Sequence, residues 1–216
     1  MVRGRQSRAA YNPMLIVRSK YKIAKRLGAG VFEQTQTQKF ALSDARAKQK
    51  PRGRRGGSDY GRQLLEKQRV RFTYGLSERQ LSNYVQAAMQ EKNPAEALHK
   101  MLEMRADNAI YRAGLASTRR AGRQAVSHGH LVVGGKRITA PSYALRPGEK
   151  ITVREGSRKS PLFAGLADKA PEERRSVPTW LDSDMNILEV KVTGEPTYQK
   201  AEAGLDFATV FEFYSR

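Results

Sequence analysis

The chain has 216 residues, no cysteine, and 40 Lys and Arg against 21 Asp and Glu, a formal net charge of +19. This excess indicates a polyanionic partner, either nucleic acid or an anionic membrane. The lack of cysteine excludes disulfides and cysteine-ligated zinc, and no apolar run of about 18 residues encodes a transmembrane helix. A hydrophobic content of 39% suffices for a modest core, and we expect two small cores.

Residues 1–57 carry most of the excess charge, with 15 Lys and Arg against two acids, Glu33 and Asp44. The Arg- and Gly-rich run at 50–57 repels itself and cannot bury a core. We therefore expect a basic N-terminal arm that orders only on a partner, with a short helix within 11–25. The alternative is a solvated tail that aids solubility. No cleavage-like break follows the arm, which favours mature protein over an organellar presequence.

Three helices are predicted within 58–101. Each begins with a recognisable signal, namely the N-cap Ser58, a capping box at 77–80, and a cap, an N1 proline and an N3 glutamate at 93–96. An apolar stripe at 81–89 predicts core packing. The basic side chains within 61–71 offer one phosphate-facing surface.

Residues 102–114 have apolar positions at helical spacing and are predicted to form one helix. Arg105 and Arg112 fall on its other side, so one face is expected to be core and the other positive. Glu103 and Asp107 could pass for a carboxylate pair, but Asp107 is better explained as the structural partner of a nearby arginine.

A second helix is predicted over 117–129, from the N-cap Ser117 to Gly129, which suits the left-handed residue after a helix end. Small residues such as Ala121 and Ala125 form its inner side, so the two helices can approach closely. Three arginines are then predicted to project from its outer surface as a cluster: Arg119, Arg120 and Arg123.

Strand patterns follow. Residues 130–139 predict a hairpin around Gly134–Gly135, because glycine tolerates the positive φ of a tight turn. Further strands are predicted at 151–154 and 187–193. The fold class is therefore α+β, with helices packed on a small, mainly antiparallel sheet.

The remaining segments are less regular. We expect an exposed connection over 156–175 with a short helix at 162–170. From 180 to 216 there are seven acids and three bases, so this end is not expected to face a polyanion. The apolar segment 207–214 fits either a strand or a helix.

No catalytic, metal or cofactor site is predicted. The glycine pair at 28–30 lacks the spacing and the following Gly-Lys-Ser/Thr of a phosphate-binding loop, so it indicates a turn. His128 and His130 lie two residues apart without a third ligand, and helix-end packing or nucleic-acid contact explains them better than a metal.

One stretch resembles a known RNA-binding element. Arg-Ala-Asp-Asn-Ala-Ile-Tyr-Arg-Ala-Gly at 105–114, together with 118–130, 133–138 and Pro-Ser-Tyr at 141–143, is similar to the alpha-L RNA-binding motif. With Ser58-Asp-Tyr-Gly-Arg-Gln-Leu-Leu-Glu-Lys-Gln68 and Tyr74-Gly75, the chain resembles the bacterial-type family of small-subunit ribosomal protein number four. The similarity runs from Ser58 to Glu155 and resumes at the C-terminal Phe-Tyr-Ser-Arg. Some family members carry a cysteine zinc knuckle near the N-terminus, which this chain lacks.

The resemblance implies a structural ribosomal protein, not an enzyme, that binds the five-prime region of small-subunit ribosomal RNA directly, early in assembly, and supports decoding accuracy. Two basic surfaces would clamp RNA helices at a junction. The expected domains are the arm 1–57, a helical domain 58–101 completed by 197–216, and an alpha-L domain 102–196. Expected partners are ribosomal RNA, neighbouring ribosomal proteins and messenger RNA near its entrance, without a cofactor, a membrane or homo-oligomers. The expected location is the ribosome in a bacterial cytoplasm.

The candidate RNA-binding residues offer guanidinium and ammonium groups for phosphates, polar groups for hydrogen bonds, and flat rings for unstacked bases. They are Arg5, Arg8, Lys20, Lys22, Lys25, Arg26, Arg52, Arg54, Arg55, Ser58, Tyr60, Arg62, Gln63, Lys67, Arg71, Tyr74, Arg105, Arg112, Thr118, Arg119, Arg123, Gln124, His128, His130, Lys136, Arg137 and Tyr143.

Two alternatives use the same motif. An RNA-modifying enzyme would need a separate catalytic domain, such as pseudouridine synthases and a tRNA synthetase have, and no stretch of this chain offers one. A stress-related RNA-binding factor would leave the resemblance at 58–74 unexplained. An ordinary solvated helix surface is the simplest alternative for the positive groups at 105–137.

Overall fold

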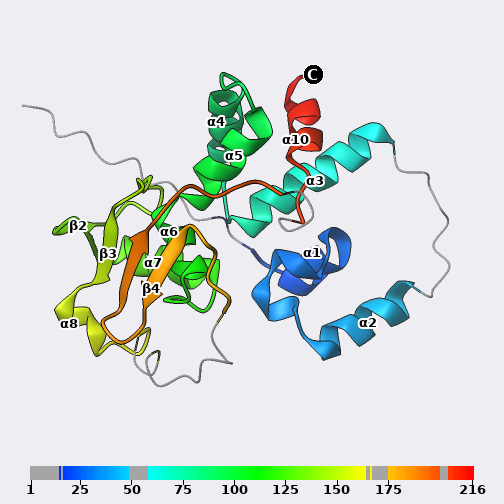
Figure 1. Cartoon of the computed structure of the whole chain (residues 1–216). Helices are drawn as coiled ribbons and strands as arrows, with labels where there is room; N and C mark the ends of the chain where they lie inside the picture. The colour runs from blue at the N-terminus through cyan, green and yellow to red at the C-terminus, as the bar shows by residue number, and fades with distance from the viewer. Residues whose placement is uncertain (1–14, 16, 49–57, 164–165, 167–174, 200–203) are drawn as a thin grey trace, which may run out of the picture.

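The computed structural model (Figure 1) describes residues 15, 17–48, 58–163, 166, 175–199 and 204–216. Within these residues the chain has a helical part and a part in which helices pack on a small sheet. The predicted α+β fold is confirmed. None of the helices in these ranges is long and apolar enough to cross a membrane.

The helical part is built from both ends of the chain, because the C-terminal helix α10 returns to lie against α3 (Figure 1). The segment that fitted either a strand or a helix is thus helical. The elements of this part are α1 (Lys20–Leu27), the short 3-10 turns η1 (Ala29–Val31) and η2 (Glu33–Thr35), α2 (Gln38–Lys48), α3 (Asp59–Thr73), α4 (Glu78–Ala88), α5 (Pro94–Glu103) and α10 (Phe207–Tyr214).

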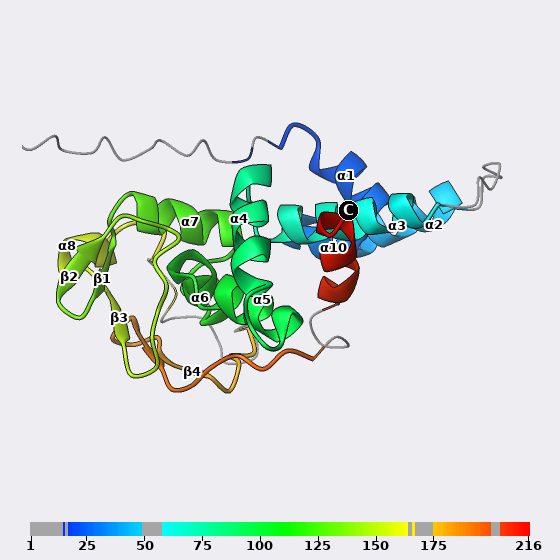
Figure 2. The ribbon, with the colours of Figure 1, turned by 90° about the horizontal axis from the view of Figure 1, so that it is seen from above.

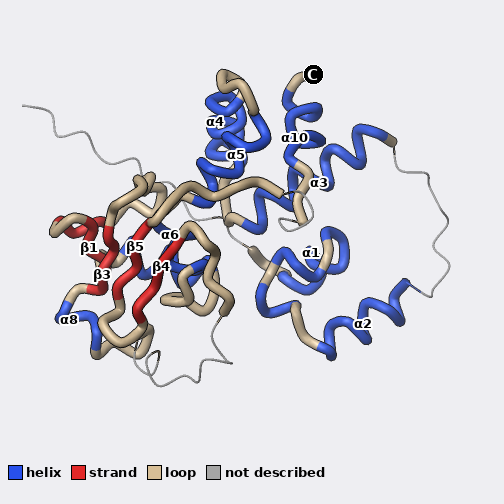
Figure 3. The backbone as a smooth tube through the Cα atoms, in the orientation of Figure 1, coloured by secondary structure: helices blue, strands red, loops and turns tan. Residues whose placement is uncertain are grey.

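The second part holds an antiparallel sheet with the strand order β2-β1-β3-β5-β4. Figure 1 labels β2, and Figure 3 labels β1, β3, β5 and β4. The predicted hairpin forms at Gly134 and Gly135, whose φ angles of +55° and +80° suit glycine. The elements are α6 (Ala106–Arg112), α7 (Arg119–Ser127), β1 (Leu131–Val133), β2 (Lys136–Ile138), β3 (Lys150–Val153), α8 (Glu155–Arg158), β4 (Leu181–Asp184) and β5 (Glu189–Val192).

Two of the predicted helix caps form as expected. Ser58 Oγ accepts a hydrogen bond from the Gly61 N–H at 3.1 Å and begins α3. At α4, Ser77 Oγ accepts from the Gln80 N–H at 3.3 Å while Gln80 Oε1 accepts from the Ser77 N–H at 3.0 Å. These reciprocal bonds satisfy donors that the first helical turn leaves without partners.

Two other helix starts differ from the prediction. The cap of α7 is Thr118 rather than Ser117, because Thr118 Oγ1 accepts from the Ala121 N–H at 3.1 Å. At α5, Pro94 occupies the first turn as predicted, but Asn93 makes no side-chain cap hydrogen bond.

The single helix predicted over 102–114 is divided in two. Arg105 between α5 and α6 is extended, with φ −70° and ψ 138°, and forms an isolated β-bridge with Ala144. The break turns α6 away from the axis of α5, and it changes which way the side chains of 105–112 point.

Three apolar cores hold the described residues together. The largest lies between α6, α7 and the sheet, and its side chains without exposed surface include Ile110, Val126, Leu131 and Ile151. The second joins α3, α4, α5 and α10, and its side chains without exposed surface include Val70, Leu81, Leu102 and Phe207. The two cores expected from composition are present, and each stabilises its part through the burial of apolar area.

The third core was not expected, because it lies in the N-terminal segment. Phe72 of α3 packs on buried side chains of this segment, and its ring lies 6.3 Å from the ring of Phe32. No core was predicted for the arm 1–57, but its described residues 17–40 include buried apolar side chains, namely Ala24, Leu27, Val31, Phe32 and Phe40. The Arg- and Gly-rich run at 50–57 lies outside the described residues.

Small differences remain after the hairpin. The strand predicted over 187–193 is β5, and it pairs with β4, which the alternation pattern did not reveal. The short helix predicted over 162–170 lies mostly outside the described residues, and α8 precedes it. Seen from above (Figure 2), α6 and α7 lie between the sheet and the helices α3, α4 and α10.

Candidate nucleic-acid interface

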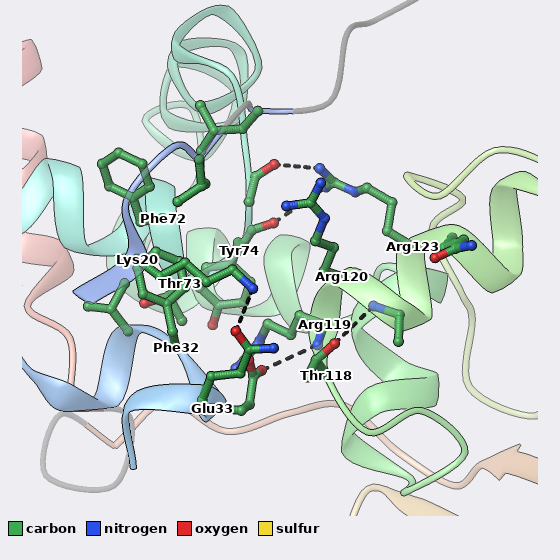
Figure 4. A pocket seen from close by; sticks show the side chains of 17 residues that line it. Lys20, Phe32, Glu33, Phe72, Thr73, Tyr74, Thr118, Arg119, Arg120 and Arg123 are labelled. Carbon is green, nitrogen blue, oxygen red and sulfur yellow. Dashed lines mark hydrogen bonds and ion pairs between the residues drawn. The ribbon is translucent and has the colours of Figure 1, made fainter. Parts of the chain in front are cut away.

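A cleft of about 230 Å³ lies where the helical part meets the N-terminal half of α7 (Figure 4). The segment before α1, the η1–η2 turns and the end of α3 form one wall, and α7 forms the other. The structure brings together six predicted site residues around it: Lys20, Tyr74, Thr118, Arg119, Arg123 and Gln124.

Arg123 ties α7 to the turn between α3 and α4. Its Nε donates to Asp107 Oδ2 at 3.0 Å, its Nη1 donates to the Gly75 carbonyl, and its Nη2 donates to the Tyr74 carbonyl at 3.4 Å. Only 12% of its side chain is exposed. Because a guanidinium has five donors in one plane, one side chain can satisfy a carboxylate and two carbonyls together.

Asp107 also holds Arg105, which is 2% exposed. Arg105 Nε and Nη2 donate to the two Asp107 oxygens at 3.0 and 2.7 Å, and Nη1 donates to Tyr84 Oη at 2.7 Å. Burial opposes the charged form, but the adjacent Asp107 carboxylate raises the pKa of Arg105. Asp107 is thus the structural partner of two arginines, as its position predicted for one.

Glu103 is the centre of a second buried network. Its carboxylate accepts from Tyr74 Oη at 2.7 Å, from Asn108 Nδ2 at 2.8 Å, and from Arg112 Nε and Nη2 at 2.8 and 3.0 Å. Burial alone would raise its pKa, but the bonds and charge of Arg112 lower the pKa of Glu103 to about 2. Burial, and then the negative charge of Glu103, raise the pKa of Tyr74 well above its ordinary value.

Arg119 also points inward. Its Nε donates to Asn108 Oδ1 at 2.8 Å, and its guanidinium lies 4.4 Å from the centre of the Tyr111 ring. Its backbone N–H donates to Glu33 Oε1 at 3.3 Å. The expectation that Arg119 and Arg123 project outward is therefore wrong, because buried carboxylates and carbonyls lie beneath that side of α7.

The outward face of α7 is instead formed by Arg120 and the residues four and eight positions after it. Arg120, Gln124 and His128, spaced by four, are all exposed, and the Arg120 side chain has no hydrogen bond or ion pair with another described residue. Arg120 was absent from the predicted site. Its helical spacing with Gln124 and His128 was visible in the sequence, but spacing alone does not show which side of a helix is covered.

The expected positive face at 105–112 does not form, since Arg105 is buried and the half-buried Arg112 is bound to Glu103. On α3, three more predicted residues serve the protein itself. Gln63 and Lys67 are buried and donate to Glu212 at 3.0 Å and Glu78 at 2.8 Å, and Arg71 Nη1 donates to Gln68 at 3.2 Å. These donors are thus engaged within the protein.

Other predicted residues remain exposed. His128, Lys136 and Arg137 lie on the surface beside the β1–β2 hairpin, and Arg137 donates to the carbonyls of Gly129 and His128, both at 3.0 Å. His130 Nδ1 lies 2.9 Å from Ser157 Oγ. These contacts fix the end of α7 against the hairpin, so both present their polar groups on one continuous surface.

The remaining predicted residues lie at three separate places. Tyr143 Oη donates to Glu149 at 3.1 Å beside the sheet. Exposed groups lie at the start of α3 and along α1, namely Ser58, Tyr60 and Arg62 on α3, and Lys22, Lys25 and Arg26 on α1. Five lie outside the described residues: Arg5, Arg8, Arg52, Arg54 and Arg55.

Sequence reasoning also missed exposed cations on other elements, such as Arg79 on α4 and Arg154 before α8. Neither belongs to a charge cluster, so no pattern distinguished them. Across the described ranges, no group of three or more His, Asp or Glu is placed to hold a metal ion.

Comparisons with known proteins agree with this organisation. The family model "Ribosomal protein S4/S9 N-terminal domain" matches residues 16–103, and the model "S4 domain" matches residues 104–151. Small ribosomal subunit protein uS4 of Roseiflexus sp. and that of Chloroflexus aurantiacus are each 39% identical to this chain, over 90% of the chain and 96% of their own length. The same protein of Borrelia turicatae is 37% identical over 92% of the chain and 96% of its own. The chain therefore belongs to the family of small ribosomal subunit protein uS4, whose members are structural proteins and not enzymes.

Proposed function

We propose that this protein binds small-subunit ribosomal RNA directly, early in subunit assembly, and then supports decoding accuracy from its place in the subunit. The observation that carries the proposal is that the arginines of α7 lie on two different sides of the helix. Arg119 and Arg123 are held by the buried Asn108 and Asp107. In contrast, Arg120, Gln124 and His128 face outward beside a cleft lined by Lys20. The outward groups are thereby held on a rigid support.

Rigid support matters because binding a flexible polyanion costs side-chain and chain entropy. A helix fixed at both ends does not have to be ordered when RNA binds, so the cost is limited to the exposed side chains and the RNA itself. The RNA-binding role is thus assigned to the exposed face of α7, the adjoining β1–β2 hairpin and the cleft, with Arg105 and Arg112 acting as support. The second basic surface was expected within 61–71, where Lys67 and Arg71 are engaged with other residues of the protein. We therefore assign it to the exposed cations of α1.

The proposed setting is the small subunit in a bacterial cytoplasm, as a single copy. Ribosomal RNA is the main partner, with neighbouring ribosomal proteins and the messenger RNA near its entrance as further partners. The acid-rich segment from residue 180 onward supports a division in which that end faces proteins rather than RNA.

The test is the salt dependence of binding to a transcript of the five-prime domain of small-subunit ribosomal RNA. Log K should fall linearly with log salt, by about 0.9 per neutralised phosphate on duplex and less on single strands. Arg120→Gln should lower affinity and reduce the slope by about one. Lys191→Gln is the matched control, because Lys191 lies between the buried Val190 and Val192 and so points from the sheet face away from α7.

Binding that does not change with salt, or that weakens equally in both variants, contradicts the proposed surface. Direct early binding requires that the free transcript bind without other ribosomal proteins. The accuracy role requires that Arg120→Gln, introduced into the cellular protein, change the misreading of a reporter while Lys191→Gln does not.

A further inference from the structure

The cleft beside α7 has two chemically different walls. On one side Leu15, Val17 and Phe72 are half-buried, so each keeps some apolar surface open to the cleft. Behind them Val31 and Phe32 are buried and belong to the third core. The opposite wall is the first two turns of α7 (Figure 4).

Charge in the cleft is predominantly positive. Its lining includes four cations, Lys20, Arg119, Arg120 and Arg123, and one acid, Glu33. Glu33 is occupied by Arg119, through the backbone N–H at 3.3 Å and through Nη1 at 3.7 Å. The cleft therefore favours an anionic occupant over a neutral or cationic one.

Two of these cations keep donors for a ligand. The Arg120 guanidinium makes no hydrogen bond with another described residue, and Lys20 Nζ makes one, to Gln34 Oε1 at 2.7 Å, out of the three that an ammonium can donate. Arg119 and Arg123 are committed to protein groups. An anion in the cleft would be held by Arg120 and Lys20.

Size restricts the occupant further. The cleft volume of about 230 Å³ is below the roughly 300–1,000 Å³ of sites for drug-sized ligands, so it has room for one ring system. Single-stranded RNA offers flat bases that leave the stack and rest on aromatic and apolar side chains, each still attached to a phosphate. A lipid headgroup would lack a flat aromatic ring, and a neutral peptide would lack the charge.

We propose that this cleft receives one unstacked base of the bound RNA, with the base against Phe72 and Val17 and its phosphate on Arg120 and Lys20. The proposal rests on the RNA-binding function proposed above and names the contact at the level of a single nucleotide. It predicts that one position of the RNA matters through its base as well as through its phosphate.

The test replaces single nucleotides in loops and bulges of the five-prime-domain RNA by abasic nucleotides, which keep the phosphate and remove the base. With the full-length wild-type protein, one position should lose roughly 5- to 150-fold in affinity, the range for stacking one base on aromatic side chains. Phe72→Leu keeps an apolar side chain in the third core. With this variant, the abasic substitution at that position should lower the affinity several-fold less than it does with the wild-type protein. Phe213→Leu is the control, because this half-buried phenylalanine lies on α10 away from the cleft and should leave the loss unchanged.

A second variant guards against misfolding of Phe72→Leu. Gln124→Trp adds a bulky ring at an exposed position of the cleft wall, where no core is disturbed. It should weaken binding of the unmodified RNA and abolish the abasic effect. Thermal melts of each variant show whether the fold is retained.

The outcomes separate the two proposals. The base pocket is refuted if no abasic position lowers the affinity more than the others do. It is also refuted if neither Phe72→Leu nor Gln124→Trp changes the loss of affinity at the sensitive position. The cleft would then hold at most a phosphate, and salt-dependent binding would still support the RNA-binding function. If the wild-type protein binds the transcript no better than an unrelated RNA, the proposed function itself fails.

Discussion

At the scale of single residues, two buried carboxylates organise the junction between the two parts of the protein. Asp107 receives Arg105 from its own part and positions Arg123, which reaches the carbonyls of Tyr74 and Gly75 in the other. Glu103 joins Tyr74, Asn108 and Arg112. Removing one partner from such a network leaves a buried charge uncompensated. The resulting loss in the free energy of unfolding is larger than the net stabilisation that the pair provides.

We predict a pH-dependent loss of stability for Glu103→Gln. The pKa of Glu103 is lowered from 4.5 to about 2 in the folded protein, so its stabilising effect is complete above about pH 4.5 and disappears as the pH falls towards 2. The variant should be less stable than wild type by roughly 3 kcal/mol at pH 7, and the difference should shrink below pH 4.5. Urea denaturation at pH 7, 5 and 3 measures it.

Glu91→Gln is the control for that experiment, because Glu91 is exposed and should change stability little at any pH. A difference between Glu103→Gln and wild type that stays constant from pH 7 to pH 3 would show that the carboxylate charge is not what stabilises the network.

At the scale of elements, α7 depends on close contact with α6. Gly122 is buried on α7, and a Cβ placed there would lie 2.5 Å from the Asp107 carbonyl oxygen and 3.3 Å from Ile110 Cγ1. The small inner side predicted from the sequence is therefore required by the packing. This close approach brings Arg119 and Arg123 within reach of Asn108 and Asp107.

Gly122→Ala is predicted to destabilise the protein by about 1–3 kcal/mol, because the clash with a backbone oxygen outweighs the better helix propensity of alanine. Gly61→Ala in α3 is the matched control, since its Cβ would meet only Ser58 Oγ at 3.4 Å. That change should stabilise by up to about 1 kcal/mol. Thermal denaturation measures the stability of both variants. Equal changes in stability for Gly122→Ala and Gly61→Ala would refute the close packing of α6 and α7.

At the scale of the whole molecule, the helical part needs the C-terminal segment. Phe207 of α10 has no exposed surface and packs in the core with Val70 of α3, and its ring lies 5.0 Å from the ring of Tyr198. Residues far apart in the chain are thus joined in one core. The α3–α4 turn that receives Arg123 is supported by that core.

Phe207→Ala should cost about 3–5 kcal/mol, the usual range for emptying a fully buried phenylalanine site. Phe213→Ala on the same helix removes a half-buried ring and should cost less. Far-UV circular dichroism during urea denaturation measures both. A cost below about 1 kcal/mol for Phe207→Ala would mean that α10 is not needed by the helical core.

Several features were determined by the sequence alone, because they depend on neighbouring residues. Ser58 and the capping box at Ser77 satisfy donors within their own first turns, and Gly134–Gly135 supplies the φ angles of its own hairpin. Net charge and the helical spacing of the arginines are likewise local properties. The family resemblance at 58–155 rested on such runs of adjacent residues.

Other features were decided only by the tertiary structure, because their partners are distant in the chain. Helical spacing shows that Arg119 and Arg123 share a side and that Arg120 does not, but Asp107 and the Gly75 carbonyl determine which side is covered. The N-terminal core needed Phe72 from α3, and the helical form of 207–214 is stabilised by packing on α3. In each case the deciding contact joins segments that no local pattern connects, and burial against that partner outweighs what the segment favours by itself.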